Sequence, residues 1–171
     1  MVAACQRHGE RAANDSLKAR VVTAGIGEIS ATAGGTQTLS VLRFIADQVD
    51  IRAGDTVEWT NQDPVTPHTV TFGTEPMGLA LFVPSAIPPT TIGVDTDGEL
   101  HAVINSPGES VNSGLIRAAF QDQMGKPQTD LGVTRFRVTF KSGGAFPYIC
   151  GLHDTLGMKG TVMVFPKVPP K

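Results

Sequence analysis

Short segments in which apolar and polar residues alternate, each ended by turn residues, constrain the fold of this chain most strongly. Phe136, Val138 and Phe140 alternate with polar or charged residues near the end of the chain, which predicts a strand buried on one face. Val57 and Trp59 alternate with polar residues in the same way. No long stretch has helical periodicity, and short strands separated by turns are typical of an all-β fold. We therefore predict an antiparallel β-sandwich.

The length and composition indicate one domain with additions at both ends. The chain has 171 residues, of which 40% are hydrophobic, enough for one buried core. Residues 1–36 are rich in Ala, Gly, Thr and charged residues, and we interpret them as an N-terminal tether with room for one early strand. The domain is expected at residues 37–166, followed by a loose tail at residues 167–171.

One long segment inside this domain, residues 74–133, has no clear pattern because Pro and Gly interrupt each apolar run. We expect a loop-rich insertion there, with a short strand at residues 100–104 and a short helix at residues 115–124. A segment of this length without regular structure is often functional.

The overall charge excludes one class of partner. The formal net charge is -2 and the pI is near 6.0, so a basic surface that would follow phosphates is not expected, and nucleic acid is not an expected partner. No apolar run approaches the roughly 20 residues that a membrane-spanning helix needs. We expect a soluble domain without a membrane-spanning segment.

The two cysteines have such different surroundings that we expect separate roles rather than a disulfide. Cys5 follows the small residues 2–4, and this order resembles the lipobox of bacterial lipoproteins, in which the cysteine becomes lipidated. Residues 1–4 would then be the remnant of a signal peptide, and the protein would lie outside the cytoplasm, in the periplasm or at the cell surface. The alternative is a chance cysteine near the start of the chain.

A candidate metal site lies near the C-terminus, where Cys150, His153 and Met158 follow one another with the spacing C-x2-H-x4-M. Thiolate and imidazole suit copper in both oxidation states, and a thioether is a weak axial ligand. The set needs another nitrogen, and His68 is the candidate because it lies on the apolar face of its own strand, where a sandwich brings it over the C-terminal loop.

Each of these residues also has an ordinary structural explanation. His68 would then be a core histidine, Cys150 an inert buried thiol and Met158 a packing residue. Zinc is the rival metal, although structural zinc sites use several Cys and His ligands and do not recruit Met.

Two separated parts of the chain resemble the plastocyanin-like cupredoxins, the family of type 1 or blue copper proteins. Residues 53–61 leading to 68–72 match one part of the family pattern, and residues 148–153 leading to 158–160 match another. These parts cover the second and the last quarter of the chain. The resemblance implies a Greek-key β-sandwich with one copper ion at one end.

The four ligands of that family map onto His68, Cys150, His153 and Met158. The resemblance therefore implies a single-electron carrier that cycles one copper ion between Cu(I) and Cu(II) and docks transiently with redox partner proteins. We expect a monomer. His153 would be the ligand that reaches the surface, within an apolar collar that includes Leu156.

Three further residues have expected environments. Asn61 and Thr69 are expected to form hydrogen bonds around the first histidine ligand and its loop. His101 has no partner that can be identified in the sequence, and we expect it to face solvent.

Two other functions remain as alternatives. A copper-dependent enzyme or enzyme-associated domain, related to nitrite reductases or multicopper oxidases, needs further copper ions and further histidines. The chain has only four histidines, so we predict that it is not an enzyme. A copper-buffering protein would carry repeated Met and His ligands on exposed segments, and the sequence shows no such repeat.

Overall fold

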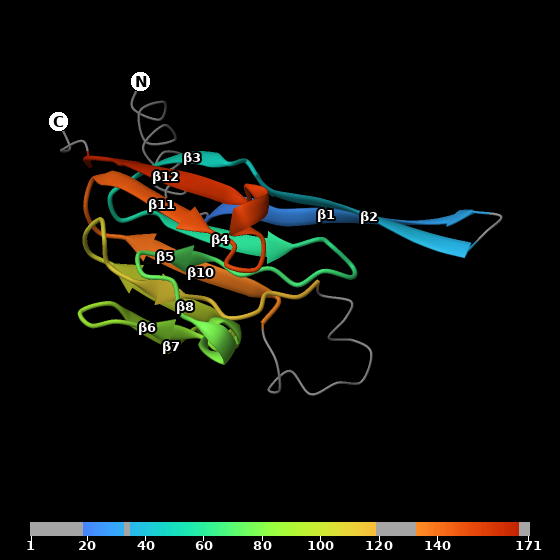
Figure 1. The fold of residues 1–171 in the computed structure, drawn as a ribbon. Helices are drawn as coiled ribbons and strands as arrows, with labels where there is room; N and C mark the ends of the chain where they lie inside the picture. Colours follow the sequence, from blue (N-terminus) through green and yellow to red (C-terminus); the bar gives the residue numbers. More distant parts are fainter. Residues whose placement is uncertain (1–18, 33–34, 119–132, 168–171) are drawn as a thin grey trace, which may run out of the picture.

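The protein folds into two packed β-sheets, as a computed structural model of the chain shows (Figure 1). The structure describes residues 19–32, 35–118 and 133–167. Within these ranges helix is confined to two short 3-10 turns, so the predicted all-β sandwich is confirmed.

Each sheet contains six strands. The first sheet has the order β2 (Gly35–Ile45), β1 (Arg20–Thr32), β4 (Thr56–Asn61), β10 (Arg135–Phe140), β8 (Leu100–Ile104) and β7 (Thr91–Val94). The second sheet has the order β3 (Gln48–Arg52), β12 (Lys159–Phe165), β11 (Gly144–Ile149), β5 (Thr71–Phe72), β9 (Val111–Asn112) and β6 (Ser85–Ala86). The 3-10 turns are η1 (Gly78–Phe82) and η2 (Asp154–Leu156).

Both sheets are mixed rather than purely antiparallel. β1 runs parallel to β4, β8 runs parallel to β10, and β3 runs parallel to β12. The prediction of an antiparallel sandwich is wrong for these pairs. The chain crosses between the sheets several times, for example from β4 to β5 and from β10 to β11, so strands that are distant in the sequence become neighbours, as in a Greek key.

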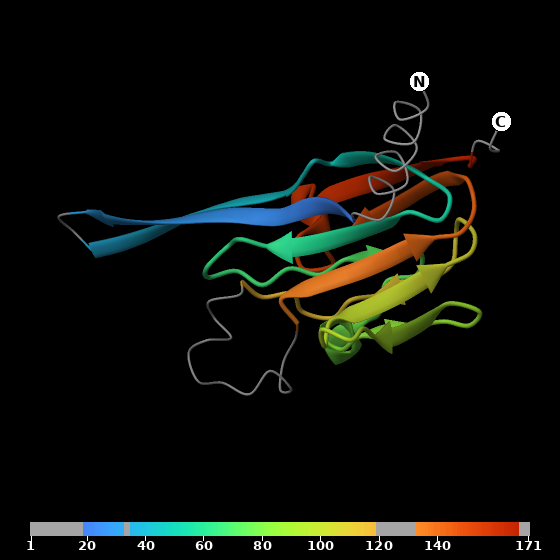
Figure 2. The same cartoon turned by 180° about the vertical axis from the view of Figure 1, so that it is seen from behind.

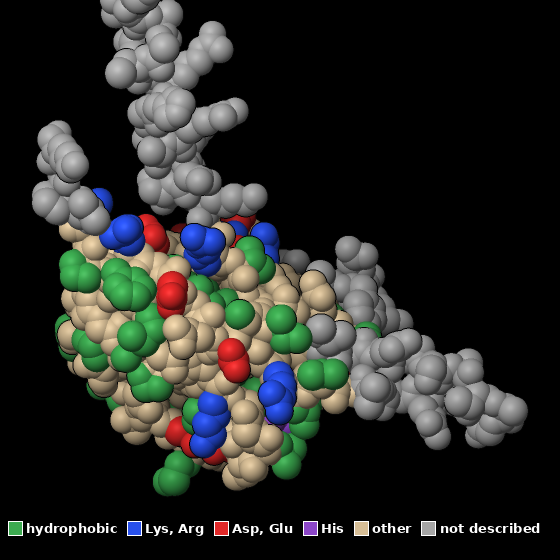
Figure 3. Space-filling view, turned by 90° about the horizontal axis from the view of Figure 1, so that it is seen from above, with side chains coloured by type: hydrophobic (Ala, Val, Ile, Leu, Met, Phe, Trp, Pro, Cys, Tyr) green, Lys and Arg blue, Asp and Glu red, His purple; other side chains and the backbone are tan. Residues whose placement is uncertain are grey.

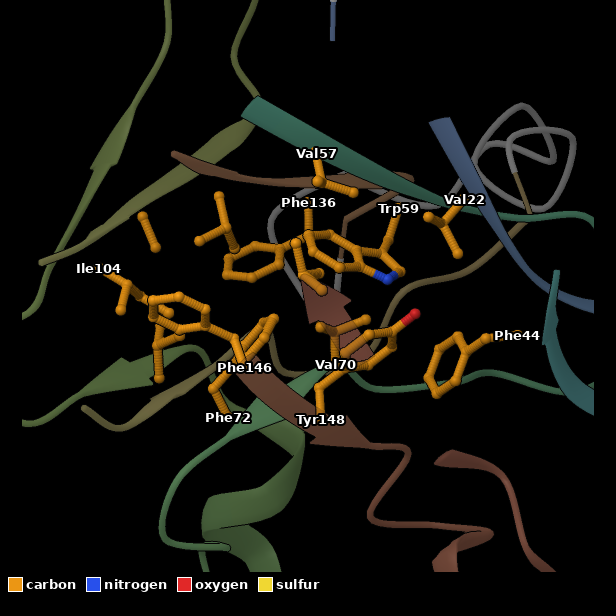
Figure 4. Packing of buried hydrophobic residues seen from close by; sticks show 14 of the residues in the cluster. Val22, Phe44, Val57, Trp59, Val70, Phe72, Ile104, Phe136, Phe146 and Tyr148 are labelled. Atoms are coloured by element: carbon orange, nitrogen blue, oxygen red, sulfur yellow. The ribbon is translucent and has the colours of Figure 1, made fainter. Parts of the chain in front are cut away.

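The predicted alternation of buried and exposed residues is confirmed in the central strands. In β10, Phe136, Val138 and Phe140 are fully buried. In β4, Val57 and Trp59 are fully buried as well. These side chains fill the space between the two sheets (Figure 4).

An aromatic cluster joins the sheets close to the C-terminal loop. The Trp59 ring of β4 lies 5.3 Å from the Tyr148 ring of β11 and 5.7 Å from the Phe72 ring of β5, measured between centroids. Phe44 adds an edge contact to Tyr148 at 4.7 Å. Edge-to-face pairs of this kind stabilise a core beyond their buried area. Figure 4 shows the four rings between the layers. They hold β4, β5 and β11, whose ends carry the candidate site.

The domain begins before residue 37, which corrects the expected boundary of the tether. β1 begins at Arg20 and pairs with β4 from Arg20 opposite Val57 to Ala24 opposite Asn61. Val22 and Ala24 are fully buried, so this segment belongs to the core. Beyond this pairing, β1 and β2 continue as a hairpin that extends past the sandwich (Figures 1 and 2). The remainder of the expected tether, including Cys5, lies outside the described residues.

The expected insertion at residues 74–133 is instead part of both sheets. It contains η1 and the four strands β6 to β9: β8 pairs with β10 and β9 pairs with β5, while β7 and β6 pair with β8 and β9. The strand predicted at residues 100–104 is confirmed as β8. The helix predicted at residues 115–124 is wrong for the described part, where Ile116 forms β-bridges with His68 and Val133. Residues 119–132 lie outside the described part.

His101 has partners, so the expectation that it faces solvent alone is wrong. Its Nδ1 lies 3.0 Å from Asp95 Oδ1, and its Nε2 lies 2.7 Å from Thr139 Oγ1. Arg137 joins the same network on the outer face of the sheet, with bonds to Asp95 at 3.0 Å and to Glu58 at 2.7 Å. Both ring nitrogens of His101 therefore have partners on this sheet, so His101 has a structural role.

Charges of both signs are mixed on the surface. In the view of Figure 3, Lys and Arg side chains lie among Asp, Glu and apolar side chains, without a continuous basic area on the described part of that face. Among the helices of the described residues, none is long and apolar enough to cross a membrane.

Candidate metal centre

The candidate ligands meet at one end of the sandwich. β4 and β11 both end there, and this is the end from which the β1–β2 hairpin projects (Figure 1). The loop after β4 brings His68, while the loop after β11 brings Cys150 and His153. Met158 follows η2 and directly precedes β12. Two loops from strands that are packed against each other therefore converge, although they are far apart in the sequence.

The geometry brings two imidazoles to one thiol. Cys150 Sγ lies 3.7 Å from His68 Nδ1 and 3.4 Å from His153 Nδ1. The ring centroids of His68 and His153 are 5.0 Å apart. One donor atom from each of the three residues lies within 4.8 Å of the others, which is close enough to share one metal ion. The prediction that His68 meets the C-terminal loop is therefore correct.

The three donors differ in exposure and in the direction in which burial shifts their pKa values. His68 and Cys150 are fully buried, whereas His153 is partly exposed. Burial, with repulsion from His153, lowers the pKa of His68 to about 4, so its imidazole is neutral and has a lone pair to offer. Burial also lowers the pKa of His153 and raises that of the Cys150 thiol. A metal must therefore displace the thiol proton when it binds.

Backbone hydrogen bonds close the C-terminal loop. Cys150 N–H donates to Met158 O at 3.0 Å, and Met158 N–H donates to His153 O at 3.1 Å. Gly157 has φ of 87°, a left-handed conformation that glycine adopts without strain. The Met158 side chain is fully buried. These bonds hold the segment that contains all three C-terminal candidates in one conformation.

Thr69 joins the two loops, as expected. Its backbone N–H points to Cys150 Sγ at 3.4 Å, and its Oγ1 accepts a hydrogen bond from Gly151 N–H at 2.8 Å. A donor aimed at sulfur stabilises the thiolate form and reduces its freedom to move. Thr69 thus links the position of His68 to that of Cys150.

Asn61 supports the histidine loop, also as expected, though without touching the His68 ring. Its Nδ2 donates to Thr66 O and to Ile116 O, each at 2.9 Å. Ile116 in turn exchanges two backbone hydrogen bonds with His68, at 3.1 and 2.7 Å. The buried amide therefore ties the loop after β4 to a segment from the region that was expected to be an insertion.

Sequence reasoning missed two residues that touch His68. Asp63 is fully buried, and its Oδ2 lies 3.9 Å from His68 Nε2. Gly25, in a bulge of β1, lies so close to the ring that a Cβ there would overlap Nε2. The acidic residue in the Asn-Gln-Asp-Pro turn was a signal for the first. Nothing in the sequence pointed to Gly25, because only tertiary packing places β1 over the ring.

Apolar side chains are exposed near His153, although the acidic side chain of Glu75 also lies against Gly151 at this end. Leu156 is 66% exposed beside His153, which agrees with the expected collar. η1 extends this surface, because Leu81 lies against Gly151 while the neighbouring Leu79 is 82% exposed. The sequence did not reveal this addition, since η1 lies in the segment that had no readable pattern.

The donor chemistry fits copper, and a comparison with known families agrees. Two neutral imidazoles and one thiol, with a buried thioether nearby in sequence, are the soft and borderline donors that copper prefers. The family model of copper binding proteins of the plastocyanin/azurin family matches residues 30–165. The chain belongs to the plastocyanin/azurin family. Its membership makes copper, rather than zinc, the metal of this cupredoxin.

Solved structures of cupredoxins are similar to this chain at low sequence identity. The oxidized plastocyanin of Dryopteris crassirhizoma is 19% identical, with a TM-score of 0.42, and the match covers 85% of this chain and 99% of that one. A reduced tryptophan-to-tyrosine variant of amicyanin is 15% identical, with a TM-score of 0.45, and the match covers 86% and 82% of the two chains. No curated protein sequence matches this cupredoxin.

The hydroxyl of Thr69 is expected to protect the Cys150 loop from opening. Thr69→Val keeps the shape but leaves the Gly151 N–H without its acceptor, which costs about 1 kcal/mol. We expect roughly fivefold faster hydrogen exchange at the Gly151 amide of the metal-free protein. Thr69→Ser retains the hydroxyl and should keep this amide protected. Equal exchange in both variants would show that the bond does not hold the loop.

Proposed function

We propose that this cupredoxin is a single-electron carrier with one type 1 copper ion, bound by His68, Cys150, His153 and Met158. The convergence of two buried donors and one partly exposed donor on a common point carries this proposal. Met158 would complete the ligand set with its thioether, because its side chain is buried and its backbone is bonded to both Cys150 and His153.

The protein would contribute a site that changes little between the two oxidation states. Copper supplies the one-electron couple when bound. The backbone bonds of the C-terminal loop and the Thr69 contacts fix the thiol and the imidazoles before the metal arrives. Because these donors are held in fixed positions, little structural change should accompany electron transfer. Burial of Cys150 and His68 keeps water away from the metal position.

Electrons would enter and leave through the partly exposed edge of His153. Leu156, which is exposed beside His153, would form an apolar contact that can exclude water during a brief encounter. Small and weak interfaces are typical of transient redox encounters. We propose redox proteins as partners and a monomeric carrier.

The number and the positions of the histidines favour a carrier over an enzyme. Two of the four histidines lie at the proposed copper site, and His101 is held by Asp95 and Thr139. A nitrite reductase or oxidase activity would need a second metal site with its own ligands. Copper counting separates these functions: one tightly held ion with strong visible colour supports the carrier. Two or more ions per chain favour an enzyme, and a colourless Cu(I) protein favours copper buffering.

We also propose that the protein works outside the cytoplasm, attached to a membrane by a lipid on Cys5. The small residues before Cys5 support this location. The intact mass of the protein isolated from its native membrane fraction should include a lipid adduct. A Cys5→Ser variant should lose both the adduct and the membrane association, and an unmodified wild-type mass would refute the anchor.

Cys150→Ser should abolish the charge-transfer colour of the copper-loaded protein, because a serine hydroxyl does not replace a thiolate ligand. Visible absorption after copper titration measures the effect. Cys5→Ser is the matched control and should retain the full colour. A Cys150→Ser protein that stays blue would contradict thiolate ligation and with it the proposed site.

Met158→Leu should keep one copper ion but raise the reduction potential. Leucine has a similar volume, so the loop should keep its packing, whereas the loss of the thioether removes a donor that stabilises Cu(II). Redox titration followed by visible absorption measures the potential. Met163→Leu, a methionine change in the neighbouring strand β12, serves as the control. An unchanged potential in Met158→Leu would show that this sulfur is not an axial ligand.

A further inference from the structure

The His68 ring faces a buried carboxylate on the side away from Cys150. His68 and Asp63 are both fully buried, and the distance from His68 Nε2 to Asp63 Oδ2 is 3.9 Å. Neither of these two atoms has a hydrogen-bond partner in the described structure. Buried polar atoms without partners are rare because each costs free energy, so the pair requires an explanation.

The proposed ligand role determines which nitrogen of His68 carries the proton. Nδ1 is the nitrogen that faces Cys150 Sγ, at 3.7 Å, and a metal bound there needs its lone pair. In a neutral imidazole the proton must then be on Nε2. The Nε2–H group of the loaded protein is therefore a buried donor that points toward Asp63.

Gly25 separates this donor from solvent. It has φ of 62°, in the left-handed region, at the point where the β1–β2 register shifts. The Gly25 Cα lies directly against the His68 ring, and a Cβ on this residue would overlap His68 Nε2. Because Gly25 has no side chain, the bulge of β1 leaves room for the imidazole, and its backbone covers the ring. Water on that side is replaced by backbone.

A turn holds the Asp63 carboxylate in place. Its Oδ1 accepts hydrogen bonds from Val65 N–H and Thr66 N–H, each at 3.0 Å, and its own N–H donates to Asn61 Oδ1 at 2.7 Å. These bonds account for one carboxylate oxygen as a turn-forming group. They do not account for the burial of Oδ2 beside the ring, since a turn needs only one oxygen.

We propose that Asp63 is a positioning residue for the copper site, whose Oδ2 accepts the Nε2–H of His68 and whose negative charge favours Cu(II) over Cu(I). This inference rests on the proposed copper function. A hydrogen bond requires the two atoms to approach by about 1 Å from the separation seen here. Ligating histidines are commonly oriented in this way by a carboxylate, which selects the tautomer and strengthens the donor.

Asp63→Asn tests the proposal in the full-length copper-loaded protein. The amide oxygen can replace Oδ1 in the turn, so the loop should keep its form, while the buried charge is lost and an N–H faces the Nε2–H. We expect the Cu(II)/Cu(I) equilibrium to shift toward Cu(I) by about tenfold, which raises the reduction potential by about 59 mV for a one-electron couple. Redox titration of both proteins measures this shift.

Glu75→Gln is the matched control for charge. Glu75 also lies at this end of the molecule, against Gly151 beside Cys150, but its side chain is exposed and therefore screened by water. Its replacement should shift the potential much less than Asp63→Asn does. Equal shifts in the two variants would mean that any nearby charge has this effect, and would overturn the specific role of Asp63.

A second measurement needs no variant. In the wild-type Cu(I) protein, proton NMR should show a His68 Nε2–H resonance that exchanges slowly with water and is displaced by its hydrogen bond. A rapidly exchanging or absent resonance overturns the inference even if Asp63→Asn fails to fold. If the wild-type protein binds no copper at all, the proposed function falls instead. An Asp63→Asn protein with an unchanged potential overturns only the role of Asp63.

Discussion

The contact between the His68 segment and the Cys150 loop is the interaction on which the centre depends. Thr69 makes it in two ways, through its backbone N–H to the sulfur and through its hydroxyl to Gly151 N–H. Both loops leave strands that the aromatic cluster around Trp59 holds together. A metal site built from distant parts of a chain needs such a direct connection, because each loop alone would leave its ligands free to move.

The neighbouring segments make this connection rigid from both sides of His68. Ile116 holds the His68 backbone through paired hydrogen bonds, and Asn61 fastens that segment to the loop after β4. Gly25 covers the other side of the ring. Segments that looked like a tether and an insertion are therefore structural supports of the site. The same packing makes His68 a neutral imidazole, since burial disfavours its charged form.

Sequence patterns were reliable where a strand has one buried face. The alternation around Phe136 and Trp59 predicted β10 and β4 correctly, because burial on one side of a sheet requires a period of two. The shortest strands were not readable, since β6 and β9 each have two residues and depend on partners from elsewhere in the chain. The parallel pairing of β1 with β4 was equally hidden, because it joins residues that no local pattern relates.

The sequence by itself determined the chemistry of the donors and the spacing of Cys150, His153 and Met158, because one short loop holds them in order. It also determined the all-β class, through the period of its apolar residues. Only the tertiary structure decided that His68 Nδ1 faces the sulfur while Nε2 faces Asp63. The orientation of an imidazole follows from the packing on both of its sides, and that packing comes from β1, the Asp63 turn and the Ile116 segment together.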